Sequence, residues 1–100
     1  MQNDLTVTLD TRLQRAEHAM HAAVGDEVVI LLAERSTYFD TNAEGAAIWE
    51  ALARPVTVRE VCAVLMTRFE VTEIDCQRDV LAFVQDGVKE GLIVEAVAAR

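Results

Sequence analysis

The spacing of apolar residues changes near residue 40 and divides the chain into an extended half and a helical half. In the first half, turn residues separate three short segments that are apolar or β-branched: 19–24, 28–32 and 36–39. The Gly25-Asp26 pair suits a two-residue hairpin turn, because glycine tolerates the positive φ that such turns need. The pattern predicts a three-stranded antiparallel meander, whose third strand is an edge unless the N-terminal segment covers it.

Three helix starts follow, each signalled by a threonine with an acidic residue three positions later. The pairs are Thr41 and Glu44, Thr57 and Glu60, and Thr72 and Asp75. Such capping patterns satisfy free amide donors at a helix start. They predict a first helix over about 42–53, stopped by Arg54-Pro55, and a second from residue 58. A third helix runs to about residue 90 and is closed by Gly91.

The third helix carries two neighbouring apolar stripes, more than the roughly 100° that an ordinary surface helix buries. One stripe consists of Ile74, Leu81, Val84, Val88 and Leu92, and the other of Cys76, Val80, Phe83 and Gly87. Either the domain buries this helix on two sides, or one stripe is free to bind a partner. Nothing in the periodicity alone decides between these two interpretations.

The N-terminal residues 1–18 are predicted to form an arm or an extra strand. Leu5, Val7 and Leu9 alternate with polar residues, which favours a strand, but an extended arm has the same pattern. The segment lacks the basic start and apolar run of a secretion signal, and no apolar run approaches the roughly 18 residues of a membrane span. We therefore expect a cytoplasmic protein that does not bind membranes.

Composition indicates one globular domain of 100 residues, with 52% hydrophobic and 26% charged residues. Seventeen acidic residues outnumber nine basic ones, and the formal net charge is −8. A nucleic-acid-binding module should present a basic patch to the phosphates, and none is visible in the sequence. The charge therefore favours a protein or peptide partner over DNA or RNA.

No catalytic or metal-binding pattern stands out. Ser36, the one serine, lacks the G-x-S-x-G setting of a nucleophile. The two histidines and two cysteines do not have the spacing of zinc ligands. Cys62 and Cys76 lie at apolar helical positions, so we expect reduced thiols in the core or in a groove. The sequence predicts neither an enzyme nor a bound cofactor or metal.

The order and spacing of several segments resemble the PqqD-like family of recognition elements for ribosomally made, post-translationally modified peptides. The segments are 38–42, 45–52, 57–61, 79–84 and 90–93. The resemblance implies an α+β fold in residues 19–95, with a three-stranded antiparallel sheet followed by three helices, related to winged helix-turn-helix domains. Residues 96–100 would then form a C-terminal tail.

The resemblance also implies a non-catalytic adaptor, which binds the leader of a precursor peptide as an added strand and presents it to a leader peptidase or other maturation enzyme. The binding positions would be the third strand and the second stripe of the third helix. These positions are Ser36, Thr37, Tyr38, Phe39, Asp40, Cys76, Asp79, Val80 and Phe83.

The sequence departs from the family pattern before the third strand, where Leu32-Ala33-Glu34-Arg35 replaces the Leu-x-Pro-Glu of the pyrroloquinoline quinone type. This favours the stand-alone proteins of lasso-peptide pathways, and a pyrroloquinoline quinone peptide chaperone is the alternative. A winged-helix domain that binds DNA or another protein is an alternative of a different class. The acidic third helix, with Asp75, Asp79 and Asp86, argues against a DNA-reading helix.

Overall fold

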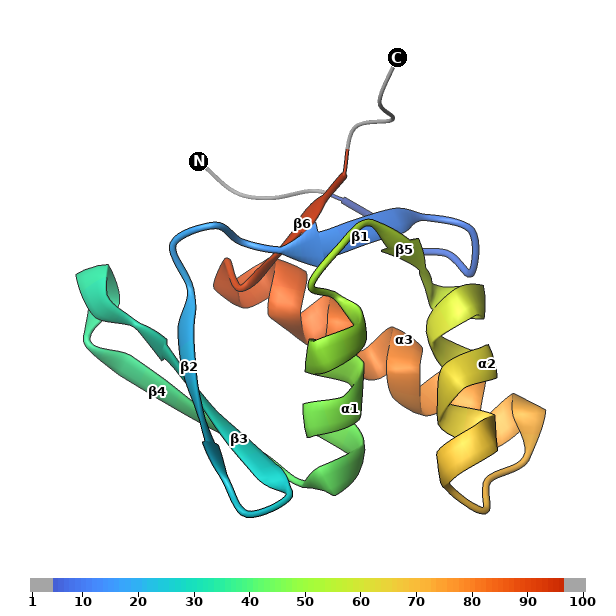
Figure 1. Ribbon diagram of the computed structural model, residues 1–100. Helices are drawn as coiled ribbons and strands as arrows, with labels where there is room; N and C mark the ends of the chain where they lie inside the picture. Colours follow the sequence, from blue (N-terminus) through green and yellow to red (C-terminus); the bar gives the residue numbers. More distant parts are fainter. Residues whose placement is uncertain (1–4, 97–100) are drawn as a thin grey trace.

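The computed structural model describes residues 5–96, which fold into two small antiparallel sheets and three helices (Figure 1). The first sheet has the order β2-β3-β4, and the second has the order β5-β1-β6. The strands are β1 (Arg12–Arg15), β2 (Met20–Val24), β3 (Glu27–Leu32), β4 (Thr37–Thr41), β5 (Val56–Thr57) and β6 (Ile93–Glu95). The helices are α1 (Ala43–Ala51), α2 (Val58–Arg68) and α3 (Glu73–Glu90).

The first sheet is the meander that the sequence predicts, and the α+β fold class is confirmed. Gly25 has a φ of 67°, and the pair Val24–Glu27 closes the two-residue turn between β2 and β3. The connection from β3 to β4 is a short 3₁₀ turn, Ala33–Arg35, that ends at Ser36 with a left-handed φ of 51°. Ser36 therefore belongs to the turn, and the third strand begins at Thr37 and extends to Thr41.

The second sheet joins three segments that are far apart in the sequence. Leu13 in β1 lies opposite Val56 in β5 and Glu95 in β6. The strand at Arg12–Arg15 comes later than the alternation of Leu5, Val7 and Leu9 suggests, and residues 5–9 are not a strand. Val7 instead packs in the core, and its amide donates to Gln85 Oε1 on α3 at 3.1 Å.

The helix starts agree with the predicted caps except at the first helix. The predicted Thr41 cap is wrong: Asn42 caps α1, and its side chain accepts from the Gly45 amide at 2.8 Å. The Thr41 hydroxyl instead bonds to both the amide and the carbonyl of Val28 on β3. Thr57 makes the predicted capping box, and Thr72 caps α3.

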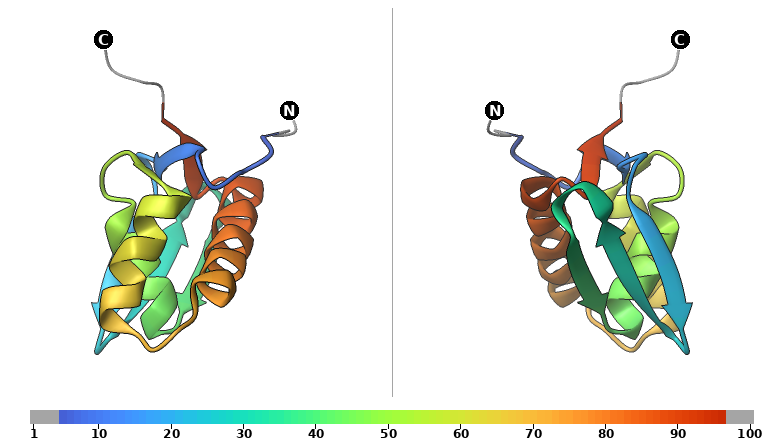
Figure 2. Two further views of the ribbon diagram at one scale, coloured as in Figure 1. Left: turned by 90° about the vertical axis from the view of Figure 1, so that its right-hand side faces the viewer. Right: turned by 90° about the vertical axis from the view of Figure 1, so that its left-hand side faces the viewer.

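A single core lies between the first sheet and the helices, under the second sheet (Figure 2). Its largest fully buried side chains are Trp49, Leu13, Ile30, Leu32, Ile48, Leu52, Leu65 and Ile93. The opposite face of the first sheet carries no helix among the described residues, and β2 is exposed along its whole length. Burying these apolar side chains is the main stabilising contribution to the fold.

Candidate functional site

Strand β4 is an edge of the first sheet, so one side of its backbone has no partner strand among the described residues. The pair Val24–Glu27 closes a two-residue hairpin and is therefore hydrogen-bonded, which sets the alternation across β3. Ile30 then directs its amide and carbonyl toward Phe39 on β4. It follows that the amides and carbonyls of Tyr38 and Asp40 point outward at the free edge.

Side chains alternate across β4, as in any strand. Phe39 and Thr41 are partly buried and face the helices, whereas Tyr38 is 70% exposed on the other face. The free edge therefore combines outward backbone groups with an aromatic residue on each face of the sheet.

Helix α3 lies beside β4 (Figure 2). Residues of both elements line a hollow of about 210 Å³. Its lining is mostly apolar, with acidic residues at the rim. The residues are Ile30, Phe39, Asp40, Thr41, Trp49, Phe83, Asp86, Gly87, Glu90, Leu92 and Ile93. Trp49 is 1% exposed, and its Nε1–H has no hydrogen-bond partner among the described residues.

Two glycines shape this hollow because each lets another residue approach closely. A Cβ atom on Gly87 would overlap Ile93 Cδ1 and would lie 2.8 Å from Ile93 Cγ1. A Cβ atom on Gly45 would lie 3.1 Å from Phe83 Cε2 and 3.0 Å from Thr41 Cβ. Phe83 therefore packs against the start of α1, and α3 packs against β6 at the position of Gly87.

Acidic side chains border the aromatic ring on α3. Asp79, Phe83, Asp86 and Glu90 are spaced by four, three and four residues, which places them along one line of the helix. Asp79 lies 3.8 Å from Arg78, and Glu90 lies 3.4 Å from Arg35. Among the described residues, no ion pair or hydrogen bond involves the carboxylate of Asp86.

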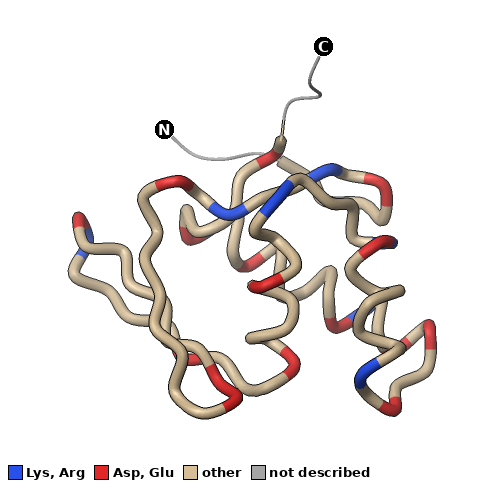
Figure 3. The backbone as a smooth tube through the Cα atoms, in the orientation of Figure 1, with Lys and Arg blue, Asp and Glu red and all other residues tan. Residues whose placement is uncertain are grey.

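The hollow is bordered by acidic residues, and the whole molecule is acidic as well, with a formal net charge of −8. Figure 3 shows acidic positions over most of the fold, and basic positions over β1 and the loop that follows α1, at the turn between β3 and β4 and at the end of α2. The two arginines of β1 are Arg12 and Arg15, and Arg54 lies in that loop. The hollow itself is lined by three acidic residues, Asp40, Asp86 and Glu90, and Arg35 in the turn between β3 and β4 pairs with Glu90.

The structure brings Phe39, Asp40 and Phe83 together at the hollow, as the sequence-based site requires. Ser36 lies in the turn before β4 and Thr37 is the first residue of that strand, both outside the hollow, and Tyr38 contributes its backbone to the free edge. Asp79 is half-buried and lies on the helix line beside the hollow.

Two of the predicted positions lie elsewhere. Cys76 and Val80 are both 0% exposed and belong to the core, so they do not line the hollow. Cys76 packs against α2, where its Sγ lies 3.9 Å from the Cys62 carbonyl oxygen. The stripe expected to face a partner therefore divides: Cys76 and Val80 face the domain, and Phe83 faces the hollow.

Eight of the lining residues are not among the predicted positions: Ile30, Thr41, Trp49, Asp86, Gly87, Glu90, Leu92 and Ile93. Three of them follow Phe83 at helical spacings of three, four and seven residues. That spacing is visible in the sequence, but acids at such positions are typical of the solvated face of a helix, and only the neighbouring strand distinguishes them.

Neither thiol has the properties of a nucleophile. Both cysteines are free and buried, and burial raises the pKa of the Cys62 thiol to about 12. Burial raises the pKa of Cys76 as well. Within residues 5–96, no group of three or more His, Cys, Asp or Glu side chains could hold a metal ion. No helix in the same range is long and apolar enough to cross a membrane.

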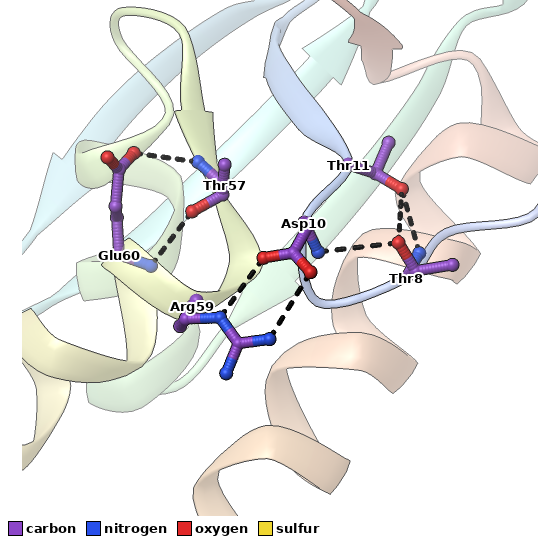
Figure 4. A network of polar contacts seen from close by, with 6 residues as sticks. All are labelled: Thr8, Asp10, Thr11, Thr57, Arg59 and Glu60. Atoms are coloured by element: carbon purple, nitrogen blue, oxygen red, sulfur yellow. Dashed lines mark hydrogen bonds and ion pairs between the residues drawn. The ribbon is translucent and has the colours of Figure 1, made fainter.

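A polar network away from the hollow fastens the N-terminal segment to α2 (Figure 4). Arg59 donates from Nε to Asp10 Oδ1 at 3.1 Å and from a terminal nitrogen to Asp10 Oδ2 at 3.3 Å. This hydrogen-bonded guanidinium lowers the pKa of Asp10. The Arg59 amide also donates to the Leu9 carbonyl at 3.0 Å, so the segment before β1 is held at two points.

The family model described as "Coenzyme PQQ synthesis protein D (PqqD)" matches residues 27–93. This range begins at β3 and ends at the first residue of β6, so it includes both walls of the hollow. No curated protein matches the chain.

Three solved structures share the fold. TbiB1 in complex with the TbiA(beta) leader peptide is 24% identical, with a TM-score of 0.76 over 85% of this chain and 99% of that one. Lasso peptide synthetase B1 complexed with the leader peptide is 22% identical, with a TM-score of 0.72, and the match covers 82% of this chain and 96% of that one. The solution structure of the PqqD truncation of Methylobacterium extorquens PqqCD, a stand-alone RiPP recognition element, is 12% identical, with a TM-score of 0.74 over 89% and 95%.

Proposed function

The chain belongs to the coenzyme PQQ synthesis protein D (PqqD) family, and from this we propose that it binds the leader segment of a ribosomally made precursor peptide. The leader would add a strand to the free edge of β4 and place side chains in the hollow beside α3. The single observation that carries this proposal is the coincidence of an unpaired strand edge with an apolar hollow. Either feature alone is common, but together they provide both backbone and side-chain recognition.

The backbone contacts would come from Tyr38 and Asp40, whose amides and carbonyls point outward. In strand addition, main-chain hydrogen bonds supply affinity, and pockets for alternate side chains supply specificity. Side chains of the added strand that point toward α3 would meet Phe39 and Phe83. Both rings are partly buried in the free protein and would lose further contact with water. Aromatic anchors of this kind usually dominate an interface.

We further propose an adaptor without catalysis, which delivers the bound leader to a leader peptidase or another maturation enzyme in the cytoplasm. Two of the similar structures are described as complexes with a leader peptide, and the third as a stand-alone recognition element. The lasso-peptide type is favoured over the pyrroloquinoline quinone type, because lasso peptide synthetase B1 is 22% identical to this chain and the PqqD truncation is 12% identical.

The test compares two variants at one edge position, Tyr38→Pro and Tyr38→Ala. Proline removes an amide that points away from β3, a position where edge strands tolerate it, so the sheet should survive. Alanine removes the same side chain but keeps the amide. The probe is a set of fluorescein-labelled synthetic peptides tiled across the leader of a precursor encoded beside this gene, titrated by fluorescence anisotropy.

We expect Tyr38→Pro to weaken binding at least about fivefold relative to Tyr38→Ala, because one hydrogen bond contributes about 0.5–1.5 kcal/mol and the ring also obstructs the incoming strand. Circular dichroism and the fluorescence of Trp49 check that both variants are folded. If the folded proline and alanine variants bind the peptide equally well, the leader does not pair with β4.

A further inference from the structure

The line of α3 that faces the free edge carries one aromatic residue followed by two carboxylates. Phe83 lines the hollow together with Asp86 and Glu90, three and seven positions later. The aromatic ring favours an apolar side chain, whereas the carboxylates favour a cation. A peptide on β4 meets both features at once, so its sequence should carry both.

Among the three carboxylates on this line of α3 (Asp79, Asp86 and Glu90), only that of Asp86 has no ion pair with a described residue. Arg35 donates to the Glu90 carbonyl at 2.8 Å and to its carboxylate at 3.4 Å, and Arg78 bonds to Asp75 at 3.0 Å and lies near Asp79. Lys89 follows Asp86 by three positions, but no ion pair between them occurs among the described residues. Asp86 therefore faces the hollow with a negative charge that no described residue neutralises.

The residue spacing of an extended strand and that of an α-helix together determine where a cation on the bound peptide would lie. Residues on one face of an extended strand are about 6.6 Å apart, twice the rise of about 3.3 Å per residue. On a helix with a rise of about 1.5 Å, Asp86 lies about 4.5 Å and Glu90 about 10.5 Å beyond Phe83. Along the direction of α3, a peptide side chain two positions from the apolar residue at Phe83 therefore lies between Asp86 and Glu90.

We infer that the peptide bound on β4 carries a lysine or arginine two positions from the apolar residue that contacts Phe83, with its cation held by Asp86. This rests on the proposed function, because it assumes a peptide strand at this edge. Toward the other end of α3, Asp79 lies about 6 Å from Phe83 along the helix, but Arg78 already accompanies it. The charge preference is therefore one-sided, and the ligand has a basic residue on the Glu90 side of its anchor.

The test is a selection that works without the sequence of the natural leader. A library of random dodecapeptides made by mRNA display is selected in parallel on the wild-type protein, on Asp86→Asn and on Asp26→Asn. Asp26 is a matched control, because it is also an exposed aspartate but lies in the turn between β2 and β3, outside the hollow. Asparagine keeps the size of each side chain and removes only its charge.

We expect the wild-type protein and Asp26→Asn to enrich Lys or Arg two positions from an enriched apolar residue, at least about threefold over the library. Asp86→Asn should keep the apolar preference and lose most of the basic one. One enriched peptide, synthesised with its basic residue replaced by glutamine, should lose about fivefold or more in affinity for the wild type at low salt. It should lose little affinity for Asp86→Asn.

The outcomes separate this inference from the proposed function. Enrichment of apolar residues at alternate positions without a basic preference, or a basic preference that survives in Asp86→Asn, would overturn the inference and leave the function standing. If no peptide is enriched on the wild-type protein, the proposed function fails, and the inference fails with it.

Discussion

Replacing Gly87 by alanine should destabilise this protein, although the same change in a solvent-exposed helix usually stabilises it. Alanine is favoured over glycine in a helix interior by about 1 kcal/mol. At Gly87, however, the new methyl group would overlap Ile93 Cδ1 and lie 2.8 Å from Ile93 Cγ1. Ile93 is 1% exposed and lies in β6, which pairs with β1, so relieving the overlap requires a buried side chain to leave its packed position.

The magnitude follows from two opposing contributions. Inserting a methyl group into a packed core costs about 1–3 kcal/mol, and the helix preference of alanine offsets about 1 kcal/mol of that cost. The overlap is with a fully buried side chain, so we place the cost at the upper end and expect a net loss of about 1–2 kcal/mol. With a urea slope of about 1–2 kcal/mol per molar, the unfolding midpoint should fall by roughly 1 M.

Urea unfolding is followed by the fluorescence of Trp49, the single tryptophan, and by circular dichroism. Gly45→Ala is the control, because its closest neighbours lie at 3.0–3.3 Å and include the half-buried Phe83, which has room to move. Adding Ile93→Val to Gly87→Ala removes the overlapping Cδ1 atom. The double variant should therefore be more stable than the sum of the single changes predicts. A Gly87→Ala variant as stable as the wild type would refute the reasoning.

Three further predictions concern other parts of the fold. Asn42→Ala should lower the free energy of unfolding by about 1 kcal/mol, measured by urea unfolding, because it removes the cap of α1. Cys62 and Cys76 should not react with Ellman's reagent until the protein unfolds, since both are buried and burial raises the pKa of each. Asp10 should titrate below its ordinary pKa in an NMR experiment, and Arg59→Ala should restore the ordinary value. Because the folded pKa is lowered, this pair stabilises the fold above the unfolded pKa of Asp10 and stops doing so as the pH falls through the folded value.

The sequence predicts the first sheet and the three helices because their signals are local. Gly25 marks a hairpin, Thr57 and Thr72 cap helices, and Gly91 closes α3 with a φ of 83°. Each of these residues acts on backbone within a few positions of itself. The error at the first cap is of the same local kind, because Thr41 and Asn42 are both good capping residues and only the structure shows which side chain is free to cap.

The second sheet is not predicted because its pairing is not local. β5 has two residues and β6 has three, too few for an alternating pattern, and β1 contains a single buried apolar residue, Leu13. These strands form because segments near both ends of the chain meet over the core. Residues 5–9 show the converse case, where an alternating pattern marks an extended segment packed on the core and not a strand.

The site is predicted only in part for a similar reason. Helical spacing identifies both stripes of α3 but cannot tell which one faces α2. The structure places Cys76 and Val80 in the core and leaves Ile74, at 75% exposure, in solvent. The acids Asp86 and Glu90 are seen to border a hollow only once β4 is placed beside them, and that neighbour is more than forty residues away in the sequence.

The central claim is that a peptide pairs with the free edge of β4, and amide hydrogen exchange tests it most directly. NMR spectra of the protein alone should show slow exchange at Phe39, which donates toward β3, and fast exchange at Tyr38 and Asp40. Adding a saturating synthetic leader peptide should slow exchange at Tyr38 and Asp40 at least about tenfold and change Phe39 little. If a bound peptide leaves the Tyr38 and Asp40 amides in fast exchange, it lies elsewhere on the protein and the account is contradicted.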